Sequence, residues 1–129
     1  MMNYYISAIY QGTFDEAIEK VTAELKKEGF GILTEIDVKD TLKKKLDVDF
    51  KKYRILGACN PNMAYQALQK EDKIGAMLPC NVIVEEHDDG TVEVSAVDPS
   101  ASMQAVDNKE LTEIATQVRD LLKKVIKNI

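Results

Sequence analysis

Two short segments that each contain a cysteine hold the residues best suited to chemistry. Cys59-Asn60-Pro61 stands at the end of a predicted strand, and Pro79-Cys80-Asn81 stands at the beginning of another. A thiol becomes a nucleophile and a soft metal ligand once it loses its proton. Asn60 followed by Pro61 is typical of the start of a helix. The free amides of such an end attract anions and favour a thiolate at Cys59.

The hairpin after Cys80 brings a carboxylate to the same region. Two strands, over residues 80–87 and 91–98, are predicted around Asp88-Asp89-Gly90. A three-residue loop with its glycine in the left-handed conformation places the valines of both strands together on one face, whereas a two-residue loop would mix valines with glutamates. The same register makes Cys80 and Asp98 neighbours at one end of the sheet. The other face then carries Glu85, His87, Glu93 and Ser95.

The two thiols should therefore differ in reactivity. The negative charge of Asp98 would oppose ionisation of the Cys80 thiol, which makes Cys59 the more reactive of the two. We expect a ligand-binding site formed by Cys59, Asn60, Cys80, Asn81 and Asp98. The alternative is two inert thiols buried in the sheet, since free cysteine is among the most buried residue types. In a reducing compartment we expect free thiols rather than a disulfide.

Other chemistries find less support in the sequence. Seven residues of extended chain place His87 about 23 Å from Cys80 and on the opposite face, so the two cannot share one zinc ion within the chain. Paired CxxC ligands are absent. We therefore assign no metal site, no cofactor and no catalytic residue, and interpret His87 as an exposed histidine at a strand end. One alternative is left open by the sequence. A metal ion could be bound by both cysteines together with a carboxylate or a group from a partner chain. The Gly29-Phe30-Gly31 segment leads into a strand, which excludes a nucleotide-binding loop, and the serines lack a nucleophile elbow.

The apolar periodicity predicts the elements that must position these residues. Strands are expected over residues 4–10, 30–38, 53–59, 80–87 and 91–98. Helices are expected from the capping box at Thr13 to Gly29, after Val38 as a short basic helix, from Asn60-Pro61, and over residues 111–126 with Asp107 and Glu110 capping the start. This order, β-α-β-(short α)-β-α-β-β-α, predicts one sheet covered by helices.

The composition predicts one domain over residues 1–129. With 45% hydrophobic and 30% charged residues, a chain of 129 residues can bury a substantial core. Its net charge of -5 has the wrong sign for binding nucleic acid. Residues 39–54 are locally basic, which we interpret as a solvated helix face. No apolar window approaches the ~20 residues that cross a bilayer, and no secretory signal is visible, so a cytoplasmic protein without a membrane segment is expected.

Four segments together resemble a bacterial and archaeal family, domain of unknown function family 302. The first two are residues 28–38 (EGFGILTEIDV) and 53–61 (YRILGACNP). The third consists of Ile74-Gly75 followed by Leu78-Pro79-Cys80-Asn81-Val82, and the fourth is Val97-Asp98-Pro99. The family implies an α+β fold with a mainly antiparallel sheet, a β-α-β(4)-α core with short inserted helices, and an architecture similar to that of the TATA-binding protein. It also implies a homodimer, but no known activity.

Three functions are compatible with these observations. The first is the binding of a small molecule, an anion being one option, in a cleft near the two cysteines. The second is a thiol-based redox or transferase enzyme that uses Cys59. The third is a structural dimerisation module without a small-molecule site. The sequence favours the first.

Overall fold

The computed structural model describes residues 3–129 of the chain. The strands are β1 (Tyr5–Tyr10), β2 (Gly31–Asp37), β3 (Tyr53–Cys59), β4 (Cys80–Glu86) and β5 (Val92–Val97). The α-helices are α1 (Phe14–Lys27), α2 (Val38–Leu46), α3 (Pro61–Lys70), α4 (Pro99–Ser102) and α5 (Glu110–Lys127), with 3-10 turns at Asp72–Met77 and Met103–Ala105. None of the helices in this range is both long and apolar enough to cross a membrane.

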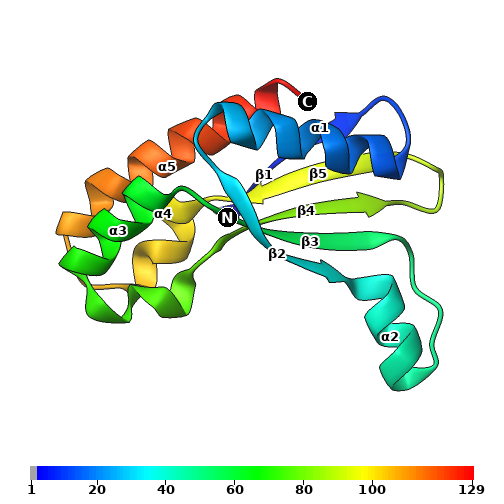
Figure 1. The fold of residues 1–129 in the computed structure, drawn as a ribbon, viewed down its shortest axis with the longest axis horizontal. Helices are drawn as coiled ribbons and strands as arrows, with labels where there is room; N and C mark the ends of the chain where they lie inside the picture. The colour runs from blue at the N-terminus through cyan, green and yellow to red at the C-terminus, as the bar shows by residue number, and fades with distance from the viewer. Residues whose placement is uncertain (1–2) are drawn as a thin grey trace.

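The strands form one antiparallel sheet in the order β1-β5-β4-β3-β2. Helices α1 and α5 lie side by side over one face, whereas α3 and α4 lie at one end of the sheet (Figure 1). We call the face under α1 and α5 the covered face and the opposite face the open face. The expected α+β class and the β-α-β(4)-α core are confirmed, with α2, α3 and α4 as the inserted helices.

The register of the β4–β5 hairpin agrees with the sequence prediction. Val84 pairs with Val94 and Val82 pairs with Ala96, and all four side chains are buried on the covered face. The His87 amide donates to the Thr91 carbonyl across a three-residue loop. Gly90 has a φ of 87°, the left-handed conformation that this loop requires.

Most of the predicted helix ends are also confirmed. Thr13 and Glu16 form a reciprocal capping box, Gly29 follows the end of α1, and Asn60 is the N-cap of α3. The expected capping of α5 by Asp107 and Glu110 is wrong. The amide of Glu110 instead donates to the side chain of Asn108.

Helix α2 projects away from the body of the protein beyond the end of the sheet (Figure 1). It has no buried residue, which agrees with the interpretation of its lysines as a solvated face. The outer strand β2, the last residue of α2 and the chain between α2 and β3 expose several large apolar side chains. They are Leu33, Ile36, Leu46, Val48 and Phe50, which we call the arm surface.

Replacing Gly57 in β3 with alanine should lower the free energy of unfolding by about 1 to 3 kcal/mol. A Cβ at this position would collide with Thr34 Oγ1 and lie 2.8 Å from Pro79 Cγ, so the proline ring must move. The matched control is Gly31→Ala in β2, where nothing lies within 4 Å of the added methyl group. Urea unfolding of both variants measures the difference, and an equal loss in the two would contradict the close packing of Gly57.

Candidate functional site

The junction between β3 and α3 is held by the side chain of Asn60. Its Oδ1 accepts a hydrogen bond from the Met63 amide at 3.4 Å, and its Nδ2 donates to the Glu28 carbonyl at 3.3 Å. The first bond caps the helix, whereas the second ties the start of α3 to the end of α1. Because Pro61 has no N–H and its φ suits a first helical turn, the chain turns directly from the strand into the helix.

A cavity of about 290 Å³ lies beyond this junction, between α3, α5 and the end of the sheet. Most of the side chains that line it are aliphatic or aromatic. The lining residues are Phe30, Leu33, Ala58, Cys59, Asn60, Met63, Ala64, Ala67, Leu68, Leu78, Pro79, Cys80, Pro99, Met103, Leu111, Ile114, Ala115 and Val118. Among them, within residues 3–129, there is no Asp, Glu, His, Lys or Arg. The cavity is therefore an apolar space with an amide and two thiols in its wall.

Three of the five residues predicted for the site line this cavity, namely Cys59, Asn60 and Cys80. Burial, with a smaller contribution from the neighbouring Cys59, raises the pKa of the Cys80 thiol to about 11. The direction agrees with the sequence prediction, but the main cause is burial and not the carboxylate of Asp98. At neutral pH the Cys80 thiol is protonated, so it adds no charge to the cavity.

The other two predicted residues lie outside the cavity wall. Asn81 follows Cys80 in β4, so its side chain points to the open face, where it lines a groove with Tyr5 and Tyr53. Asp98 accepts from the Ser100 amide at 2.9 Å and from Arg119 Nε at 3.2 Å. Its carboxylate thus caps α4 and holds α4 against α5.

The backbone bond made by Asp98 lies on the side of β5 that faces β1. The predicted register is present, but the paired residues of β4 and β5 end at Val82 and Ala96. Beyond that point the Asp98 amide donates to the Tyr4 carbonyl. The Asp98 amide is thus bonded towards the N-terminal strand, whereas its carboxylate bonds to α4 and α5.

Sequence reasoning missed the residues that give the cavity its volume. Four alanines, at positions 58, 64, 67 and 115, line the cavity and leave space that longer side chains would fill. Two thioethers, Met63 and Met103, add flexible and polarisable surface. The spacing of Ala64 and Ala67 on one face of α3 is the sequence signal that could have indicated a shallow helix face here.

Comparisons with known proteins agree with this architecture. The family model "Domain of unknown function DUF302" matches residues 6–129. A solved structure, that of an uncharacterized conserved DUF302 protein from Bacillus stearothermophilus, is similar with a TM-score of 0.90 and 28% sequence identity, over 97% of each chain. A search of curated proteins finds no match. The chain belongs to the DUF302 family.

Proposed function

We propose that this protein binds a small, uncharged and largely apolar molecule in the cavity between α3, α5 and the end of the sheet. The observation that carries the proposal is the chemistry of the wall, which is apolar apart from one amide and two thiols. A ligand there would exchange water for aliphatic and aromatic contacts, which is favourable by about 25 cal/mol for each Å² of apolar surface buried.

The size and access of the cavity support this proposal. About 290 Å³ is close to the lower end of the range of small-molecule sites, ~300 to ~1,000 Å³. Two of the lining residues are substantially exposed, Leu33 at 67% and Leu68 at 44%. Since these side chains contact both the cavity and solvent, they mark the side from which a ligand would enter.

An anionic ligand, the option that the sequence left open, has little support in this geometry. The wall has no cationic side chain to balance a negative charge. The N-terminus of α3 has few free donors, because Pro61 lacks an N–H and the Met63 amide already binds Asn60. Burying a charge without a partner is strongly unfavourable, so the cavity favours a neutral molecule.

A second function, thiol chemistry at Cys59, is supported by the difference between the cysteines. Both thiols line the same cavity, but Cys80 is held in its protonated form by burial. Cys59 ends β3 immediately before the N-cap of α3. Of the two thiols, Cys59 is therefore the one that remains as a candidate nucleophile.

We also propose that the chain self-associates through the arm surface. Its five large apolar side chains lie along an outer strand and on a segment that projects from the body. Large apolar side chains exposed on a protein surface are often covered by a partner. Within residues 3–129, no strand pairs with the outer edge of β2, and such an edge also favours association with a second copy.

Filling the cavity should stabilise the protein and abolish ligand binding. In the wild type, indole should raise the unfolding temperature in a dose-dependent manner, by an amount equivalent to about 2.7 kcal/mol at 100 times its Kd, whereas indole-3-carboxylate should have little effect. Ala115→Leu should add about 0.5 to 2 kcal/mol of stability without ligand and remove the indole effect. The matched control Ala23→Leu adds the same side chain at an exposed position on α1. In this variant indole should still raise the unfolding temperature.

Thermal unfolding followed by circular dichroism measures each of these effects. The absence of any indole effect in the wild type would contradict the proposed binding. A larger effect of indole-3-carboxylate than of indole would contradict the assignment of an uncharged ligand.

Cys59 should react with iodoacetamide faster than Cys80 at neutral pH. A thiol with a pKa of about 11 is ionised in only about one molecule in 10,000 at pH 7, and its thiolate increases as the pH rises towards that pKa. The variant Cys80→Ser retains Cys59 and should be alkylated at least about tenfold faster than Cys59→Ser, which retains Cys80. Mass spectrometry gives both rates between pH 6 and 9. Faster alkylation of Cys59→Ser, or reaction of neither variant before unfolding, would remove the case for thiol chemistry.

The proposed dimer predicts a species of twice 14.5 kDa in sedimentation. Leu46→Glu places a charge in the arm surface and should shift the population to the monomer at micromolar concentration. Thr22→Glu, an exposed change on α1, provides the control and should leave the dimer intact. A wild-type species of 14.5 kDa at every accessible concentration would contradict self-association.

A further inference from the structure

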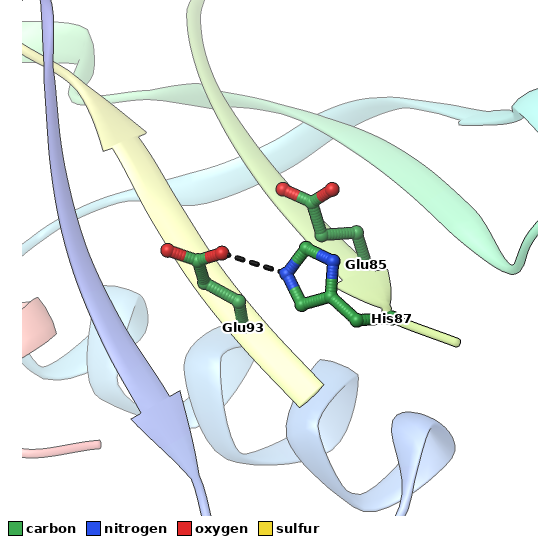
Figure 2. A group of neighbouring side chains, drawn as sticks. All are labelled: Glu85, His87 and Glu93. Atoms are coloured by element: carbon green, nitrogen blue, oxygen red, sulfur yellow. Dashed lines mark hydrogen bonds and ion pairs between the residues drawn. The ribbon is translucent and has the colours of Figure 1, made fainter. Parts of the chain in front are cut away.

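A second group of side chains capable of chemistry lies on the open face of the sheet. Glu85 in β4 and Glu93 in β5 are direct register partners, and His87 follows Glu85 by two residues, so the three project from one face. One ligand atom from each of the three residues lies within 4.8 Å of the others. Figure 2 shows the three side chains turned toward one another.

We propose that Glu85, His87 and Glu93 bind a divalent transition-metal ion of the zinc class. One imidazole nitrogen and two carboxylate oxygens are ligand types that Zn²⁺ and Co²⁺ accept, and the set contains no soft sulfur ligand. Three protein ligands leave a further coordination position for water or for a small molecule, as in catalytic zinc sites. This site is separate from the cavity, which lies on the covered side of the sheet.

The charges around the three residues favour a cation. Glu85 and Glu93 face each other across the strands, where like charges repel. Lys51 Nζ lies 2.7 Å from Glu85 Oε1 and balances one of the two carboxylates. Two carboxylates and one ammonium leave a net negative charge that a metal ion would balance.

Hydrogen bonds hold Glu93 in position before any ion binds. The Ser7 hydroxyl donates to Glu93 Oε2, and the buried Ser95 hydroxyl donates to Ser7 Oγ at 3.0 Å. His87 Nε2 lies 2.8 Å from Glu93 Oε1. The bonds from Ser7 and Ser95 are outer bonds of the kind that orient the ligands of metal sites and increase their affinity. The contact between His87 and Glu93 joins two of the proposed ligands, and an ion bound between them would replace it.

The space beside the three residues suits a site that also receives a small molecule. A groove of about 450 Å³ runs along the open face, and both carboxylates line it together with Tyr5 and Tyr53. All three candidate ligands are partly exposed, with 14%, 35% and 25% of the side chains of Glu85, His87 and Glu93 accessible. An ion can therefore reach them from solvent, and its open position would face the groove.

The single histidine of the chain makes the proposal directly measurable. In a tag-free protein, proton NMR gives one set of imidazole signals, all from His87. Zn²⁺ added to one equivalent should shift these signals, and substoichiometric Mn²⁺ should broaden them in preference to the ring signals of Phe14 in the core. Imidazole signals that stay unchanged at one equivalent of Zn²⁺ would contradict the proposed metal site. This measurement uses only the wild-type protein.

Isothermal titration with Zn²⁺ then tests whether His87 and Glu85 take part in binding. His87→Gln and Glu85→Gln should each weaken binding by more than the ~10-fold to ~100-fold loss that follows removal of a group that only supports a ligand. Glu86→Gln removes the same charge from the next residue of β4, which faces the covered side, and should leave the affinity within about twofold. Equal losses in Glu85→Gln and Glu86→Gln would show general attraction to an acidic surface and overturn the proposal.

Cobalt distinguishes this site from the two cysteines. Co²⁺ bound to the open face should give only ligand-field bands, because its ligands are nitrogen and oxygen. A thiolate-to-cobalt charge-transfer band in the near ultraviolet would place the ion at Cys59 and Cys80 and overturn the assignment. Neither result depends on the binding of indole, so the two proposed sites are tested independently.

Discussion

The pairing of the valines in β4 and β5 is the constraint on which the rest of the structure depends. A strand alternates its side chains between two faces, so a shift of one residue would turn Val82 and Val84 into solvent and bring glutamates under α1 and α5. The left-handed Gly90 allows the loop that avoids this shift. The apolar stripe of α5 needs a flat apolar surface, and the correctly registered valines supply it.

The cavity follows from how the chain leaves this sheet. Asn60 ends β3 and starts α3 at once, and its bond to the Glu28 carbonyl holds the helix at the sheet's end rather than over its centre. There α3 faces α5 through alanines, among them Ala67 and Ala115. Small side chains on two facing helices cannot fill the space between them, so the cavity is a consequence of residue size and not of a special local conformation.

The parts of the fold that could be predicted from the sequence are those governed by local rules. Strand alternation, the Thr13 capping box and the Asn60-Pro61 helix start each depend on a few adjacent residues. Helix α4 could not be predicted, because a helix of four residues has no measurable period. Asp98 was assigned to the site for a similar reason: its partner Arg119 comes from α5, and no local pattern indicates that contact.

The assignment of Asn81 could have been corrected from the sequence itself. Adjacent residues of a strand face opposite sides of the sheet, so Cys80 in the cavity requires Asn81 on the open face. The same alternation places two kinds of side chain on opposite faces of β4. Residues 80, 82 and 84 give the covered face thiol and aliphatic groups, whereas Glu85 belongs to the open face with its carboxylate. A single strand thus divides an uncharged apolar environment from an ionic one, and a molecule suited to one face is unsuited to the other.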